Sequence, residues 1–162
     1  MPEELLKVLV ADKPRNMSRD AFIGWHGIHV VSVRAKDLIE RFDPDLQQFF
    51  EVPLRTKRGV EVEGPWFIMH VSVRQDSIVM EKSRVKNSKR RPDMLNSFWV
   101  GSTAKDVIVD TSKLSPDIHF WRQARFQRSL LGSDDLVAAL KEAGIRFFPS
   151  YPTTNLRDLK EG

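Results

Sequence analysis

Apolar residues recur along the chain at two spacings, one typical of strands and the other typical of helices. A β-branched run at residues 28–31 predicts a strand, and the apolar residues that follow Ser32 predict a helix over residues 33–42. The Ser32 hydroxyl can accept a hydrogen bond from the first turn of that helix, so we expect it to be the N-cap. Residues 66–74 begin with too many apolar side chains for a surface strand, which predicts a central strand.

A second helix of the same design is predicted over residues 134–143, between Ser133 and Gly144. Two acids begin it, where the helix dipole favours negative charge, and Gly144 can adopt the left-handed conformation that ends a helix. Apolar or small residues stand three, six, seven and ten positions after each serine. Two explanations of this spacing stay open: a duplicated unit, or simply two capped amphipathic helices. The positions are Ala35, Leu38, Ile39, Phe42, Leu136, Ala139, Leu140 and Ala143.

Shorter elements are predicted around these helices. Residues 48–55 favour a strand at a sheet edge or one that ends at Pro53, because proline cannot donate to a ladder. A strand is predicted over residues 145–148, and helical segments over residues 2–10 and 21–25. Further short strands are predicted at residues 97–100, 107–109 and 118–121. The pattern indicates an α+β (mixed α/β) fold, with a central mostly antiparallel sheet flanked by two or three helices.

The length of 162 residues is that of one ordinary globular domain, so we expect a single domain over residues 1–162. An N-terminal arm at residues 1–25 precedes a core at residues 26–150. A basic loop at residues 82–91 interrupts the core, and a polar tail follows at residues 151–162.

Composition excludes several kinds of chemistry. The chain has no Cys, which excludes a disulfide framework, a thiol nucleophile, Cys-ligated zinc and an iron–sulfur cluster. No apolar stretch approaches the roughly 18 residues that a membrane-spanning helix needs. We therefore expect a cytoplasmic protein with no membrane association and no cofactor.

The positive charge is concentrated in one segment. The net charge is +4, and residues 82–91 contribute six cations and no acid, which leaves a net charge of −2 on the rest of the chain. Three interpretations stay open: a solvated loop, a sequence-independent contact with nucleic-acid phosphates, or a contact with an acidic protein surface. The six cations are Lys82, Arg84, Lys86, Lys89, Arg90 and Arg91.

Motifs for catalysis or metal binding are missing. The four His residues have no third ligand at a spacing typical of zinc sites, and neither a nucleophile elbow nor a phosphate-binding glycine loop occurs. Ser32 with the nearby His29 could form a catalytic pair, but helix capping already explains Ser32. We therefore expect no enzymatic activity and no metal site. An enzyme of unrecognised type that uses His70 or His119 is the least favoured alternative.

Aromatic residues add a second candidate binding feature. The chain has four Trp and ten Phe, and most of them should lie in the core because they stand within or beside apolar runs. Trp is over-represented at binding hot spots, so one or two could anchor a partner. We predict a partner-binding surface formed by Trp99 and Trp121 together with the cations of residues 82–91.

Three stretches, taken in order, resemble a known protein family. Residues 30–52 place a Ser before a helix and an Asp-Pro turn before a Phe-containing strand, as in its first block. Residues 64–71, followed by Asp76, resemble its central strand. Residues 107–148 resemble its C-terminal block and include Asp110, His119, Phe120, Ser133 and Gly144. The family is the eleventh class of immunity proteins in bacterial polymorphic toxin systems, and the likeness covers most of residues 28–149.

This resemblance implies an immunity protein that binds and neutralises a cognate toxin by steric occlusion during bacterial competition. It carries no catalytic residues, which agrees with the motif search. Its partner would be the toxin protein made by the same cell or its siblings. The alternative function is a nucleic-acid-binding accessory protein that uses residues 82–91.

Overall fold

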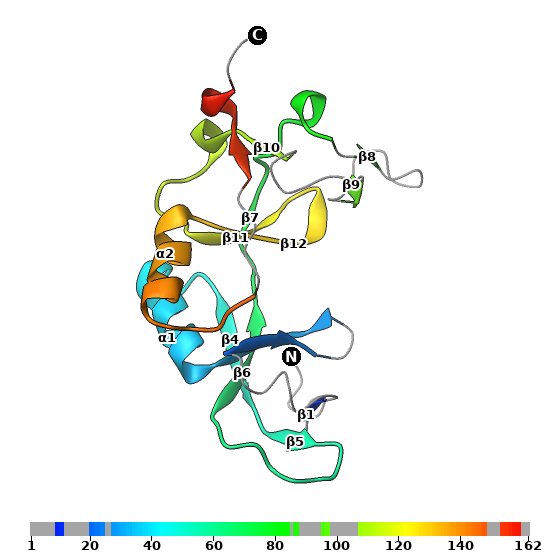
Figure 1. Ribbon diagram of the computed structural model, residues 1–162, viewed down its shortest axis with the longest axis vertical. Coiled ribbons are helices and arrows are strands. Elements are labelled where there is room, and N and C mark those ends of the chain that lie inside the picture. The colour runs from blue at the N-terminus through cyan, green and yellow to red at the C-terminus, as the bar shows by residue number, and fades with distance from the viewer. Residues whose placement is uncertain are drawn as a thin grey trace. The chain divides into compact units, whose positions relative to one another are not determined.

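The computed structural model describes residues 9–11, 20–24, 27–84, 86–87, 95–97, 107–148 and 153–159 (Figure 1). The chain divides into two compact units, which are described separately. Unit 1 comprises Met1–Ser72 and Asp134–Phe148, and unit 2 comprises Val73–Ser133 and Pro149–Gly162. The single-domain organisation expected from the sequence stays a prediction.

A four-stranded antiparallel sheet forms the centre of unit 1, in the order β2 (Ala21–Ile23), β3 (His29–Ser32), β6 (Trp66–His70) and β4 (Gln48–Val52). The apolar strand β6 therefore lies between two partners, as its composition predicted. Strand β4 is at the edge and ends before Pro53, also as predicted. These elements, together with two α-helices, confirm the α+β class.

One face of this sheet is covered by α1 (Val33–Phe42). The helix begins as predicted, because the Ser32 side chain accepts a hydrogen bond from the backbone N–H of Ala35 at 3.3 Å. Ala35 and Ile39, three and seven positions after Ser32, are fully buried. The spacing of apolar residues thus identifies the helix face that packs into the core.

Lys36 joins the exposed side of α1 to the same sheet. Its Nζ lies 5.6 Å from the Phe49 ring centroid and 5.3 Å from that of Phe67, within the range of cation–π contacts. Its salt bridge to Glu40 spans 2.6 Å, and the hydrogen bond in this pair raises the pKa of Lys36. The helix is therefore held at its exposed edge as well as by its apolar face.

The opposite face of the sheet holds a second apolar cluster. Phe22 and Trp66 meet edge to face with ring centroids 5.6 Å apart. Strand β5 (Leu54–Thr56) continues the chain after Pro53 and pairs in parallel with β1 (Leu9–Ala11). The buried members of this cluster are Phe22, Val30, Val52, Leu54, Trp66 and Ile68.

The second helix, α2 (Asp134–Glu142), ends in a Schellman motif. The N–H of Ile145 donates to the Leu140 carbonyl at 2.9 Å, and the N–H of Gly144 donates to the Lys141 carbonyl at 3.0 Å. Gly144 has a φ of +63°, the left-handed conformation predicted for this position. Leu140 and Ile145 are both buried, which adds the apolar contact that accompanies this motif.

Asp20 connects three distant segments of unit 1. Its carboxylate accepts hydrogen bonds from the Ser32 hydroxyl at 2.8 Å and from the Arg146 backbone N–H at 2.9 Å. Its backbone pairs with the same two residues, since it donates to the Arg146 carbonyl and accepts from the Ser32 N–H. The start of β2, the N-cap of α1 and the segment after α2 are thereby fixed to one another.

Unit 2 is built on a three-stranded sheet. Strand β11 (Phe120–Gln123) pairs antiparallel with β12 (Phe126–Gly132) and parallel with β7 (Arg74–Gln75). Two smaller pairs accompany this sheet: β10 (Ile108–Val109) with β13 (Thr154–Asn155), and β8 (Lys86–Asn87) with β9 (Leu95–Ser97). Among the described residues of unit 2, 3-10 helices lie at Met80–Lys82, Thr111–Lys113 and Leu156–Asp158.

A buried amide organises the polar interior of unit 2. Gln123 is fully buried, and its Oε1 accepts hydrogen bonds from the backbone N–H and the hydroxyl of Ser77 at 3.2 and 3.3 Å. Its Nε2 donates to the Asp76 carboxylate. Arg125 donates to the same carboxylate at 3.0 Å and to the Ile78 carbonyl at 2.9 Å. These bonds satisfy an amide that would otherwise destabilise the interior.

Several predicted elements differ from the observed ones. Residues 145–148 were predicted as a strand but form none, because the backbone of Arg146 bonds to Asp20 instead of a ladder. Ala21–Ile23 was predicted as helical but is β2, and Leu9–Ala11 is a strand where the predicted helix extended to residue 10. The prediction also missed β12, and residues 86–87 of the expected basic loop are in β8.

Replacement of Asp20 tests its role in stability. We expect Asp20→Ala to lower the free energy of unfolding by about 1–2 kcal/mol, because the part-buried Ser32 hydroxyl and the Arg146 backbone N–H both lose their acceptor. Urea unfolding followed by circular dichroism measures this change. Asp37→Ala is the matched control, since the Asp37 side chain is 62% exposed and should change stability by less than about 0.5 kcal/mol. Equal effects of the two substitutions would contradict the role assigned to Asp20.

Candidate functional site

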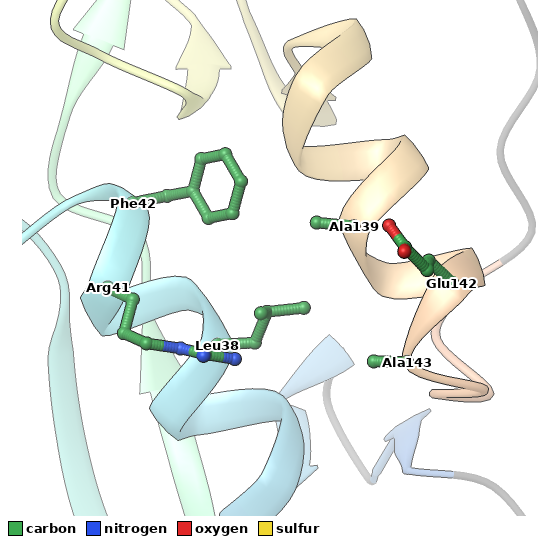
Figure 2. A pocket seen from close by; sticks show the side chains of 6 residues that line it. All are labelled: Leu38, Arg41, Phe42, Ala139, Glu142 and Ala143. Carbon is green, nitrogen blue, oxygen red and sulfur yellow. The ribbon is translucent and has the colours of Figure 1, made fainter.

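In unit 1, a groove lies between the C-terminal halves of α1 and α2. Its volume is about 420 Å³. Figure 2 shows Leu38 and Phe42 extending from α1 toward α2. The groove is lined by Leu38, Arg41, Phe42, Ala139, Glu142 and Ala143.

The groove forms because the two helices present side chains of unequal size. Six positions after its serine, α1 has Leu38 and α2 has Ala139. Ten positions after it, α1 has Phe42, and Ala143 directly follows the end of α2. The large side chains of α1 form one wall, and the methyl groups of α2 leave the space in front of them open. The residues at positions three and seven pack into the core, and Leu38 at position six is itself only 5% exposed.

Opposite charges stand at the two rims of the groove. Arg41 and Glu142 each lie nine positions after the serine that precedes their helix. Both side chains are exposed, and neither forms a hydrogen bond or an ion pair with any residue that the structure describes. The Glu142 carboxylate is turned toward the groove (Figure 2). The surface therefore combines an apolar floor with one available cation and one available anion.

Arg34 helps to fix the spacing of the two helices. Its Nη2 donates to the Ala143 carbonyl at 2.7 Å, and its Nη1 lies 3.9 Å from the Asp20 carboxylate. A cation at the C-terminus of α2 also interacts favourably with the helix dipole. The hydrogen bond from Arg34 of α1 to the carbonyl that follows α2 therefore links the two helices at one end of the groove.

The structure places the eight predicted partner-binding residues in different settings. Lys82 and Arg84 are exposed, and Lys86 belongs to β8. Trp121 is 5% exposed in β11, so its ring is buried. Lys89, Arg90, Arg91 and Trp99 lie outside the described residues. The partner-binding role of these residues stays a prediction.

Unit 2 also contains a pair of neighbouring arginines that sequence reasoning missed. Arg74 in β7 and Arg122 in β11 are directly opposite each other in the parallel register. Burial lowers the pKa of the Arg122 guanidinium, and the nearby charge of Arg74 lowers that pKa further. Like charges placed opposite each other in a sheet are destabilising. The sequence contains no signal for this pair, because it depends on which strands become neighbours.

The described histidines are engaged in structural contacts. His70 Nδ1 lies 3.1 Å from Gln48 Oε1, and the His29 ring packs edge to face on Phe148 at 5.3 Å. Within the described ranges, no three His, Asp or Glu side chains gather as ligands for a metal ion. Neither described α-helix has the length and apolar character needed to cross a lipid bilayer.

Comparison with protein families matches residues 2–151 to the immunity protein family Imm11. The chain belongs to the Imm11 immunity protein family. This assignment confirms the resemblance inferred from residues 28–149 and identifies the chain as an immunity protein, a toxin inhibitor in function. Comparison with curated protein sequences gave no match.

The groove of this Imm11 protein was missed by sequence reasoning, although its signal was present. Leu38, Phe42, Ala139 and Ala143 are among the recurring apolar positions of the two helices. Apolar spacing placed them on one face of each helix, and it did not separate residues that line a groove from residues of the core. The signal for a groove is the unequal size of the side chains at matching positions of the two helices, with Arg41 and Glu142 beside them. That signal could have distinguished a groove from a closely packed pair of helices.

Neutralising one arginine of the opposed pair should stabilise unit 2. We expect Arg74→Gln to raise the free energy of unfolding by about 0.2–1 kcal/mol, because it removes the charge opposite Arg122. The gain should shrink in 1 M NaCl, where salt screens the repulsion. Thermal unfolding at low and high salt measures both effects, with Arg58→Gln in an exposed turn as the control. A less stable Arg74→Gln protein would show instead that Arg74 makes a favourable contact.

Proposed function

We propose that this Imm11 protein binds one cognate toxin in the cytoplasm of the producing cell and neutralises it by steric occlusion. The observation that carries this proposal is the family match over residues 2–151, which makes immunity the function. Direct binding is the simplest way for a chain of this size to confer immunity. A rigid partner that covers the active site or substrate path of a toxin needs no chemistry of its own.

The geometry of unit 1 supports this mode of action. Both α-helices are fixed at their ends, α1 through the Ser32 cap and α2 through the Schellman motif. Ile39 and Leu136, at 0% and 1% exposure, anchor the two helices in the core. A surface that is already ordered loses little conformational entropy on binding, which favours a tight complex.

Inhibition should therefore be stoichiometric. When the toxin domain encoded beside this gene is produced in a host cell, we expect growth to stop, and co-production of the Imm11 protein to restore it. In the test tube, toxin activity should fall in proportion to added protein and reach its minimum at one equivalent. Light scattering after gel filtration should detect a 1:1 complex.

Two outcomes would contradict this mechanism. One is a toxin that does not harm cells lacking the Imm11 protein. The other is complete inhibition by a small fraction of an equivalent, since only a catalyst can inactivate many toxin molecules in turn. A matched culture that produces the toxin with an unrelated protein of similar size controls for expression load.

The cations of residues 82–91 would act in this proposal by attracting an acidic toxin surface. Charges at the rim of an interface mainly raise the association rate, and salt screens their effect. We expect Lys89→Gln, Arg90→Gln and Arg91→Gln together to lower the association rate with the toxin about tenfold at low salt, with little change in dissociation. Surface plasmon resonance at two salt concentrations measures both rates.

Duplex DNA is the control ligand for the same variant. The wild-type protein should not bind DNA at low salt if these cations serve the toxin. Salt-dependent DNA binding that disappears in the triple variant, with toxin association unchanged, would support the nucleic-acid function instead.

A further inference from the structure

We propose that the groove between α1 and α2 is the anchor site for the toxin, and that it receives an apolar toxin side chain flanked by one acidic and one basic residue. This inference rests on the proposed function, because it names the surface through which the protein would act. In the expected complex, the toxin acid pairs with Arg41 and the toxin base pairs with Glu142. The apolar toxin side chain packs between Phe42 and Ala139.

The size of the groove suits an anchor. A volume of about 420 Å³ can accept one large side chain with part of the backbone that carries it. It is too small to form a whole interface, but a few residues in well-packed pockets carry most of the binding energy of a complex. The groove would therefore contribute a hot spot within a larger contact.

The rim charges identify the chemistry of the occupant. Arg41 and Glu142 have opposite signs, and neither is already neutralised by a described residue. A toxin segment that pairs with them breaks no existing ion pair in this protein. Burial beneath a partner also strengthens these interactions, because water is excluded around them. A segment with the reverse order of charges would be repelled at both rims, which gives discrimination between toxins.

A small-molecule ligand fits the same surface less well. Sites for small molecules usually hold a few polar groups that converge on the ligand and fix its orientation. Here the floor is formed by Leu38, Phe42, Ala139 and Ala143, and the charged groups stand at the rims. The arrangement of an apolar centre and a polar rim is that of a protein interface.

Charge reversal at the rims tests the proposal. The probe is the toxin domain encoded beside this gene, and its dissociation constant is measured by isothermal titration calorimetry. We expect Arg41→Glu and Glu142→Arg each to weaken binding about 10- to 100-fold. Ala139→Leu, which fills the floor while keeping a good helix former, should weaken binding by a similar factor. The neutral variants Arg41→Gln and Glu142→Gln should have smaller effects of the same sign.

Matched controls change the charge of unit 1 without touching the groove. Lys141→Glu alters the residue next to Glu142 on α2, and Arg58→Glu alters an exposed turn. Both should bind the toxin like the wild type. Thermal unfolding of every variant separates a loss of binding from a loss of folding, and the neutral variants provide the result if a reversal fails to fold.

The outcomes separate this inference from the proposed function. If the wild-type protein does not bind the toxin, the proposed function fails. If the wild type binds and all groove variants bind equally well, the proposed function stands and the groove proposal is overturned. The groove proposal is also overturned if light scattering shows a wild-type dimer that both charge reversals dissociate without affecting toxin affinity, because the occupant is then a second copy of this chain.

Discussion

The position of α2 relative to α1 depends on one short polar cluster around Asp20. The carboxylate of Asp20 binds the N-cap serine of α1 on one side and the backbone of Arg146 on the other, and Arg34 extends the cluster to the last carbonyl of α2. Asp20 and Arg146 are 126 positions apart in the chain. These hydrogen bonds connect segments of unit 1 that are far apart in sequence, and they act together with the buried side chains of Ile39 and Leu136 to hold the two helices in place.

Short-range sequence features were sufficient to predict the two helices and the order of the elements around them. The Ser32 cap, the Gly144 C-cap and the apolar spacing within each helix are short-range features, so both helices were predicted correctly. The central strand was predicted over residues 66–74, whereas β6 ends at His70. Residues 21–23 and 145–148 were assigned wrongly, because their conformations depend on partners far away in sequence. Strand β12 was missed because Phe126–Gly132 lacks clear alternation and is stabilised by pairing with β11.

The candidate binding surface was harder to predict than the fold. Charge density drew attention to residues 82–91, since six cations in one segment are visible without any structure. The groove contains only one cation and one anion, and its apolar residues are indistinguishable from core residues by spacing alone. The periodicity of apolar residues predicts which side chains share a face of a helix, but it does not predict how closely a second helix approaches that face. That approach depends on contacts between distant segments, including the hydrogen bonds of Asp20 and Arg34 and the packing of the buried apolar side chains.

The two helices use different positions for the core and for the rims of the groove. Side chains three and seven positions after each serine are buried, whereas Arg41 and Glu142, nine positions after it, are exposed at the rims of the groove. Mutations at the ninth position can therefore accumulate without weakening the hydrophobic core. In the proposed complex, substitutions at these two positions would change which toxin is bound while the buried residues that stabilise the fold are unchanged.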